Sequence, residues 1–228
     1  DGVTLWWGED FGDHQHRANP ALARGVGLFV ENIHAPFEGV NNLWLNNLAG
    51  SALMDLFLRL VDDCAEYEIP TMVLHLSIGD PPPFNESGLN KIRRIVERAE
   101  RRGINIAFEN LRRLGHLNDV LSRVDSPRAG FCYDSGHRNC FTPQDDLIAT
   151  YGSRLMALHI HDNDGSGDQH RLPFEGTIDW PATMRKIAKA GYTGAVTLEA
   201  MNIGYEEMEA GAFLHLALER AKRLEGFK

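Results

Sequence analysis

The chain has 228 residues, 43% of them hydrophobic, and a formal net charge of −9 from 23 Lys+Arg and 32 Asp+Glu. This acidic charge disfavours a protein that binds nucleic acid mainly by electrostatics, and no apolar run approaches the ~20 residues that a membrane span needs. Cys64, Cys132 and Cys140 lack CxxC spacing, which favours reduced thiols and a cytoplasmic location over a disulfide framework. Without a signal-peptide pattern or a linker-like segment, we expect a single domain over residues 1–228.

Apolar, β-rich segments alternate with helical patterns along the chain. We expect seven strands, at residues 3–7, 28–35, 71–77, 105–110, 129–135, 155–161 and 195–200. The clearest helical periodicities cover 51–68 and 89–103, and a third helix is expected to begin at Asp179-Trp180-Pro181. Such alternation predicts parallel strands joined by right-handed helical crossovers, and hence an α/β fold.

The connections differ at the two ends of the predicted strands. Those that follow strands are long, as at 35–50, 78–87 and 162–178, and those that precede strands are tight. This asymmetry predicts a TIM-type (β/α) barrel with its site at the C-terminal ends of the strands, apparently lacking the first βα unit. The alternative, an open doubly wound sheet, would show a glycine-rich phosphate turn after an early strand, and the sequence has none.

Strand alternation places an ionisable side chain on one face near the C-terminal end of most strands. These residues are His34, His75, Glu109, Asp134, His159 and Glu199. A buried carboxylate is costly unless it is paired or metal-bound, so the set indicates a convergent site. Its oxygen and nitrogen donors suit Mn²⁺, Mg²⁺, Co²⁺ or Zn²⁺.

Two chemistries are compatible with this donor set. With one metal ion and two carboxylates of spare capacity, the natural reaction is proton removal beside a carbonyl. With three metal ions in a histidine-rich cluster, it is hydrolysis of a phosphodiester.

Seven motifs carry a resemblance to a known family. They are NIHAPFEG (32–39), VLHLS (73–77), IAFEN (106–110), CYDSGH (132–137), LHIHDND (158–164), DQHRLPFEGTIDW (168–180) and TLEA (197–200). The ordered series resembles the xylose-isomerase-like TIM-barrel superfamily, which holds sugar (phosphate) isomerases and epimerases and is related to endonuclease IV. Members of that family begin with a short strand and helix that have no counterpart before DGVTLWWG.

The resemblance implies roles for particular residues. The family's metal quartet falls on Glu109, Asp134, His159 and Glu199. Glu109 and Glu199 would also be the acid/base pair, and His137 would contact the substrate. The further zinc ligands of endonuclease IV fall on His34, His75, His137, Asp168 and His170, so one to three ions are left open.

We therefore predict a metal-dependent sugar or sugar-phosphate isomerase or epimerase of carbohydrate metabolism that transfers a proton through an enediolate. Mn²⁺ is the expected ion, with Zn²⁺, Mg²⁺ or Co²⁺ as alternatives. The expected partner is a small sugar, with no nucleic acid and no membrane, and assembly into a homo-oligomer is left open. The alternatives are a zinc-dependent phosphodiester hydrolase resembling endonuclease IV and a non-catalytic sugar-binding barrel. Gly115 and Gly165 stand where ketose epimerases carry a glutamate and an arginine that grip the substrate, so the sugar is not named.

Other residues have two readings each. Trp6 fits a platform for a sugar face or core packing, and His161 and His75 fit substrate contacts or support for the metal ligands. Arg171 fits a contact to a sugar hydroxyl or phosphate, or a surface salt bridge. His14 and His16 form an HxH pair in a polar loop, where we expect solvated surface.

The densest group of candidate ligands lies in residues 155–173. We expect an inner strand that ends in His159, followed by a loop that folds back across its mouth. Glycines at 165 and 167 make a reversal easy, so Asp168 and His170 would return to the same pocket. The alternative is that these two side chains only close a surface loop.

Overall fold

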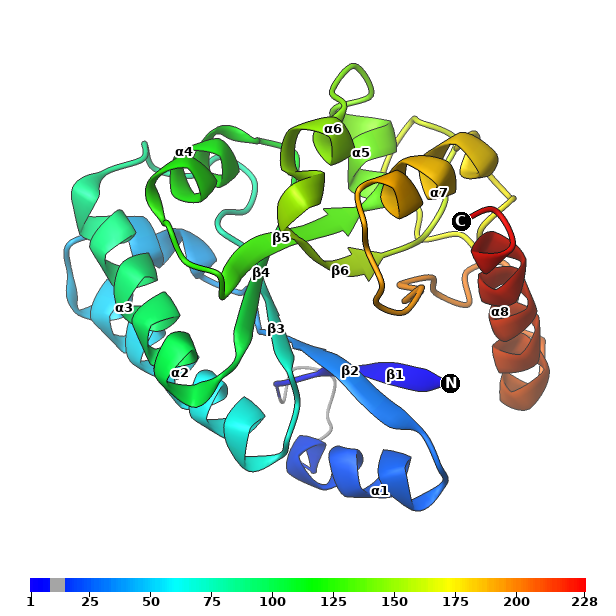
Figure 1. Ribbon diagram of the computed structural model, residues 1–228, viewed down its shortest axis with the longest axis horizontal. Coiled ribbons are helices and arrows are strands. Elements are labelled where there is room, and N and C mark those ends of the chain that lie inside the picture. The colour runs from blue at the N-terminus through cyan, green and yellow to red at the C-terminus, as the bar shows by residue number, and fades with distance from the viewer. Residues whose placement is uncertain (9–14) are drawn as a thin grey trace. The chain divides into compact units, whose positions relative to one another are not determined.

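The computed structural model describes residues 1–8 and 15–228 (Figure 1). The strands are β1 (Gly2–Trp6), β2 (Phe29–His34), β3 (Thr71–Leu74), β4 (Asn105–Glu109), β5 (Ala129–Asp134) and β6 (Leu155–His159), which follow one another in chain order in one sheet. The helices are α1 (Asn19–Gly25), α2 (Leu48–Glu66), α3 (Glu86–Arg102), α4 (Gly115–Arg123), α5 (Ser135–Phe141), α6 (Leu147–Tyr151), α7 (Trp180–Lys189) and α8 (Ala210–Glu225), with short 3₁₀ turns at His16–Ala18, Val40–Trp44 and Gly152–Arg154. This alternation of strands and helices is the predicted α/β order.

The chain divides into two compact units. The first comprises Asp1–Glu109 and Arg113–Phe131, and the second Asn110–Arg112 and Cys132–Lys228. Because β5 contributes residues to both units, the division does not follow a linker, and a single domain over 1–228 stays our prediction.

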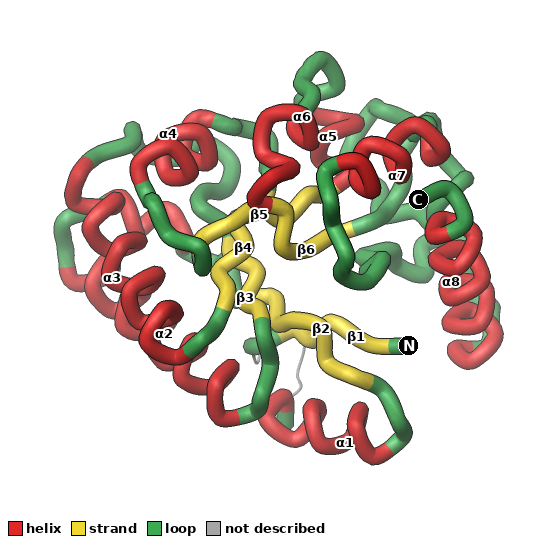
Figure 2. Tube along the Cα trace, in the orientation of Figure 1, coloured by secondary structure: helices red, strands yellow, loops and turns green. Residues whose placement is uncertain are grey.

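In the first unit, β1 to β4 pair in parallel, each with the next strand in the sequence. Helices α2 and α3 lie side by side and pack against β3 and β4 (Figure 2). The buried stripe of α2 comprises Met54, Phe57, Leu60, Val61 and Cys64. These residues recur at the three- and four-residue intervals of a helix with one face on a sheet. The periodicity expected over 51–68 is confirmed for Phe57, Leu60, Val61 and Cys64, whereas Leu53 and Leu56, which the same periodicity includes, are only half-buried and Met54 is buried instead.

Helix α3 also follows its sequence signals. Asn85 caps its N-terminus by accepting a hydrogen bond from the Gly88 amide at 2.9 Å. Gly103 ends it with a φ of 74°, a left-handed conformation that glycine adopts without strain. The periodicity expected over 89–103 corresponds to an apolar face of Ile92, Ile95, Val96 and Ala99, and this face is buried.

The second unit contains β6 and helices α5 to α8. Asp179 caps α7 through a 3.0 Å hydrogen bond from the Ala182 amide, with Pro181 in the first turn, as predicted. Among the residues described, no helix is both long enough and apolar enough to span a bilayer.

Two expectations from the sequence need correction or restriction. The seventh predicted strand, 195–200, forms only an isolated parallel bridge between Ile160 and Leu198, so the described residues contain six strands. The reason is that only Ile160 bonds to the 195–200 segment, whereas Asp162 pairs instead with Arg171 through two backbone hydrogen bonds of 2.8 and 3.0 Å. His14 lies outside the described residues, and His16 is half-buried, edge-on to Trp7 at 5.2 Å between ring centroids, rather than fully solvated.

Candidate active site

Most of the predicted site residues stand at or just after the C-terminal ends of strands. Trp6, His34, Glu109, Asp134 and His159 are the last residues of β1, β2, β4, β5 and β6. His75 directly follows β3. In a parallel sheet, side chains at matching strand ends share one edge, so the strand assignments from the sequence were enough to predict this placement.

Within the first unit, two imidazoles converge on one carboxylate. The Nε2 atoms of His34 and His75 lie 3.5 and 3.3 Å from Oε2 of Glu109. All three side chains are buried, and their candidate ligand atoms lie within 4.8 Å of one another. A carboxylate in such a dry setting requires a positive partner, either a proton on an imidazole or a cation.

Aromatic rings flank these histidines. Trp6 stacks on His34 at a centroid distance of 5.2 Å, and Phe37 stacks on His75 at 4.7 Å. Trp6 also meets Phe37 edge-on at 5.4 Å. The rings give the first unit an apolar wall next to its buried charge. A platform role was one of the two readings of Trp6 in the sequence, and Phe37 was not predicted.

Within the second unit, Asp134 has two separate tasks. One oxygen, Oδ1, caps helix α5 by accepting the His137 amide at 2.6 Å. The other, Oδ2, lies 3.1 Å from Nε2 of His161 and 3.6 Å from Nδ1 of His137. The capping hydrogen bond to Oδ1 fixes the orientation of the carboxylate. Oδ2 is therefore directed toward the histidines and can still bind a proton or a cation.

The loop after β6 returns to these residues, as predicted from its glycines. Oδ2 of Asp168 lies 3.2 Å from Nε2 of His137 and 3.3 Å from Nε2 of His170. The His170 ring stacks on His161 with centroids 4.1 Å apart. His161, Asp168 and His170 thus form a second group of candidate metal ligands, and their contacts favour a return of the loop to this pocket over a loop that only closes the surface.

His159 and Glu199 make a further pair in the second unit. Nδ1 of His159 lies 3.3 Å from Oε2 of Glu199. The Glu199 backbone is held on both sides, because its amide donates to the Ile160 carbonyl at 3.0 Å and its carbonyl accepts from Nδ1 of His170 at 2.8 Å. The short bridge that replaces the seventh strand is therefore sufficient to fix Glu199 beside β6.

The backbone contacts of three histidines define which ring nitrogen carries the proton. Nδ1 of His34, His137 and His170 each faces a carbonyl oxygen, of Ala35, Asn110 and Glu199, at 2.8, 3.0 and 2.8 Å. A carbonyl only accepts, so Nδ1 is the protonated nitrogen and Nε2 of the neutral ring presents a lone pair to its carboxylate. Two such electron-rich atoms attract each other only when a proton or a cation lies between them.

These residues fit a divalent ion. Metal-binding histidines usually donate their second ring nitrogen to a carbonyl or carboxylate, which is the pattern seen here. Two atoms that bind one ion at about 2.1 Å lie roughly 3.0–3.4 Å apart, close to the imidazole–carboxylate distances of 3.2–3.5 Å in these groups. The donors are oxygen and nitrogen, which suits Mn²⁺, Zn²⁺, Mg²⁺ or Co²⁺.

Without an ion, the Asp168–His170 pair holds a proton. Burial opposes the charge on Asp168, but its interactions with His137 and His170 outweigh this and hold its pKa well below the ordinary range. Burial likewise opposes a charge on His170, and the Asp168 carboxylate and Glu199 carbonyl outweigh it and raise its pKa to about 9. The second unit is therefore built to hold positive charge beside Asp168.

Two predicted substrate contacts are placed differently from the rest. His161 is fully buried with Nε2 on Asp134, which favours its supporting that carboxylate over touching a substrate. The guanidinium of Arg171 lies 3.4 Å from Asp164 and is partly exposed, which favours the salt-bridge alternative.

The sequence analysis missed two polar anchors. Asn110 grips the backbone of Asp134, donating to its carbonyl at 2.9 Å and accepting from its amide at 2.8 Å. Asp162 is fully buried and accepts from Nε1 of Trp180 at 2.8 Å and from the Phe174 amide at 3.0 Å. The signal that could have identified Asp162 is its position three residues past the end of a buried strand, ahead of a loop with many amides to satisfy.

A family model described as "Xylose isomerase-like TIM barrel" matches residues 7–220. The chain belongs to this family. The match covers nearly the whole chain, and it confirms the fold class and the resemblance inferred from the motifs.

Individual relatives extend the comparison. Fructoselysine 3-epimerase of Shigella flexneri is 37% identical, over 98% of this chain and 88% of its own length. The y4fM protein of Sinorhizobium fredii is 34% identical over 64% of this chain, but the match spans only 52% of that protein. Among solved structures, the IOLI protein with a zinc atom superposes with a TM-score of 0.78 at 15% identity, over 98% of this chain and 87% of that one, and this similarity concerns the fold alone.

Proposed function

We propose that the protein is a metal-dependent isomerase or epimerase of a small sugar or sugar derivative. The observation that carries the proposal is the setting of the two glutamates. Glu109 lies against two imidazoles and Glu199 against a third, at 3.3–3.5 Å. The 37% identity to a fructoselysine 3-epimerase across 98% of the chain supports the same reaction class.

In this proposal, Glu109, Asp134, His159 and Glu199 hold one divalent ion, with Mn²⁺ expected and Zn²⁺, Mg²⁺ or Co²⁺ as alternatives. When bound, the ion withdraws electron density from the substrate oxygens and makes the adjacent C–H bond more acidic. One glutamate removes that proton, and the other returns a proton on the opposite side of the resulting enediolate. His137 and His75 contact substrate hydroxyls, and Trp6 presents an apolar face to the sugar ring.

Solvent exchange tests the reaction directly. The Mn²⁺-loaded protein is incubated in D₂O with ketoses, aldoses, inososes and fructoselysine, and deuterium at carbon is followed by NMR. We expect incorporation with at least one substrate, falling by about 10²–10⁴-fold in Glu109→Gln and in Glu199→Gln. Glu66→Gln, an exposed position at the end of α2, is the matched control and should exchange as the parent does.

Absence of exchange across the panel, or equal exchange in the parent and both glutamine variants, would overturn the proposal. Tight sugar binding without exchange would instead support the non-catalytic barrel.

A phosphodiester hydrolase is the second candidate, favoured by one observation. The first unit places His34 and His75 against Glu109, and the second gathers His137, Asp168 and His170, which gives five additional candidate ligands. Two further ions in these places would give a multi-metal site suited to cleaving phosphodiesters. The net charge of −9 argues against a DNA substrate. Nicking of an abasic duplex by the zinc-loaded protein, without deuterium exchange, would favour this candidate.

Metal stoichiometry separates the ligand sets. His159→Ala should abolish tight binding of the first ion, because it removes a direct ligand from the proposed quartet. His170→Ala should leave one tight ion and weaken any second ion or the substrate. If both variants bind metal as the parent does, by elemental analysis after gel filtration, these side chains are not ligands.

A further inference from the structure

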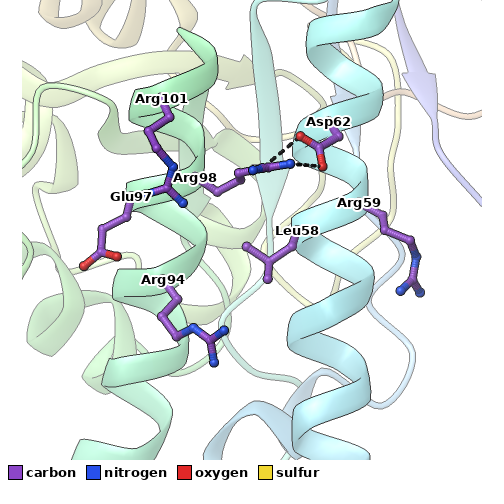
Figure 3. Close-up of a pocket in the computed structure, with 7 residues that line it drawn as sticks. All are labelled: Leu58, Arg59, Asp62, Arg94, Glu97, Arg98 and Arg101. Atoms are coloured by element: carbon purple, nitrogen blue, oxygen red, sulfur yellow. Dashed lines mark hydrogen bonds and ion pairs between the residues drawn. The ribbon is translucent and has the colours of Figure 1, made fainter.

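Outside the candidate site, the first unit has a hollow of about 210 Å³ between α2 and α3. Its lining residues are Leu58, Arg59 and Asp62 of α2 and Arg94, Glu97, Arg98 and Arg101 of α3 (Figure 3). These residues lie on the faces of the two helices that do not carry the buried apolar stripes. None of them is used by the proposed reaction.

The helical repeat concentrates positive charge in this hollow. Arg94, Arg98 and Arg101 follow one another at intervals of four and three residues, which places them on one face of α3. Together with Arg59, they place four guanidiniums in a lining that holds only two carboxylates. The lining therefore has a net charge of +2, although the net charge of the whole chain is −9. Like charges gathered in this way repel one another unless an anion joins them.

One of the two carboxylates is already neutralised within the protein. Asp62 accepts two hydrogen bonds from Arg98, at 2.9 and 2.6 Å, and a third from Arg102 at 2.7 Å. The Arg98 guanidinium is the largest cause of the pKa of Asp62 lying below its ordinary value. Figure 3 shows Arg98 reaching from α3 across to Asp62 on α2, between Arg94 and Arg101. This paired hydrogen bond between Arg98 and Asp62 links α3 to α2 and fixes the position of one side of the hollow.

Among the described residues, Arg59, Arg94 and Arg101 form no ion pair. All three are exposed, so their guanidiniums are accessible to a ligand. The basic residues in the lining are all arginine, whose planar fork binds phosphate oxygens in pairs, whereas lysine binds them as a point charge.

We propose that this hollow is a binding site for a small phosphate dianion, either inorganic phosphate or a phosphate monoester. A phosphate monoester carries a charge of about −1.5 to −2 at neutral pH, which matches the net charge of the lining. The volume of about 210 Å³ is below the roughly 300–1,000 Å³ of sites for drug-sized ligands. It therefore suits one phosphate group with a small substituent.

Calorimetric titration tests the site. The full-length protein is titrated with inorganic phosphate and, separately, with glycerol 2-phosphate at pH 8 and constant ionic strength. EDTA is present so that no divalent ion can hold the phosphate. We expect saturable binding of one equivalent per chain, weakened at least tenfold in the double variant Arg94→Gln/Arg101→Gln.

The matched control is Arg93→Gln on the same helix. Arg93 lies outside the lining and faces Glu86 at 3.5 Å, so its removal changes the charge of α3 without changing the hollow. The affinity of Arg93→Gln for phosphate should equal that of the parent. The affinity of the parent should fall at pH 5, where phosphate becomes a monoanion. Because the two substituted arginines are exposed, unfolding temperatures of the double variant and the parent should agree, which excludes a folding defect.

The two ligands identify the source of the phosphate. Tighter binding of glycerol 2-phosphate supports a phosphorylated metabolite, and tighter binding of inorganic phosphate supports the free ion. The proposal is overturned if neither binds saturably, if sodium chloride at equal ionic strength reproduces the heat, or if Arg93→Gln weakens binding as much as the double variant.

Discussion

Asp162 holds the loop that carries Asp168 and His170, and removing its charge is the sharpest test of how the second unit is built. The side chain is fully buried. Its Oδ2 accepts from Trp180 and Phe174 at 2.8 and 3.0 Å, and its Oδ1 accepts from the amides of Asn163 and Ile178 at 2.9 and 3.4 Å. In Asp162→Asn, one of the two oxygens becomes an NH₂ group that faces donors.

The magnitude follows from the donors left without an acceptor. An unsatisfied buried donor costs about 1–3 kcal/mol, and two are affected whichever way the amide is turned. Removal of a buried charge offsets part of this loss, because the carboxylate no longer has to be desolvated. We therefore expect Asp162→Asn to lower the free energy of unfolding by about 2–4 kcal/mol.

Urea denaturation of the parent and variant measures this difference, and hydrogen exchange locates it. The amide of Phe174 or that of Ile178, whichever faces the new NH₂ group, should lose protection by on the order of 10–100-fold, since its acceptor is removed. Asp164→Asn makes the same chemical change at an exposed position of the same loop, where water replaces the hydrogen bonds that Asp164 accepts from Ser166 and Gln169, and it should destabilise the protein much less than Asp162→Asn. If Asp162→Asn is no more destabilising than Asp164→Asn, Asp162 does not hold the loop.

Two further predictions concern the second unit. A Cβ on Gly136 would overlap the imidazole of His161. Gly136→Ala should therefore destabilise the protein by about 1–3 kcal/mol and shift the NMR resonances of the His161 ring. Unchanged His161 resonances would contradict this close approach. A hydrogen bond from Lys186 is the main cause of the lowered pKa of Asp146, so this carboxylate contributes stability above its ordinary pKa and loses it as the pH falls through the lowered folded-state value. Asp146→Asn should therefore be destabilising at pH 7 by at most a few tenths of a kcal/mol, since the pair is exposed, and should equal the parent near pH 2 in urea titrations. A difference that persists at that pH would show that the pair is not its origin.

Local pattern in the sequence was sufficient for the α/β order and for the positions of the candidate ligands. The period of two along a strand and the three- and four-residue spacing along α2 and α3 are properties of neighbouring residues, so no distant contact was needed to recognise them. His34, Glu109, Asp134 and His159 end their strands where the pattern placed them. The ordered motifs named the family, and the flexible glycines at 165 and 167 indicated a loop that returns.

Tertiary structure alone decided the contacts between segments far apart in the chain. It reduced the expected strand at 195–200 to a bridge, because Asp162 and Arg171 pair where a longer ladder would have continued. It also selected the protonated nitrogen of His137 through a carbonyl 27 positions earlier in the chain, and it aligned Asp62 with Arg98 across two helices. Each of these outcomes depends on hydrogen bonds and packing between residues that are far apart in the sequence. Periodic patterns describe only neighbouring residues, so they cannot predict such contacts.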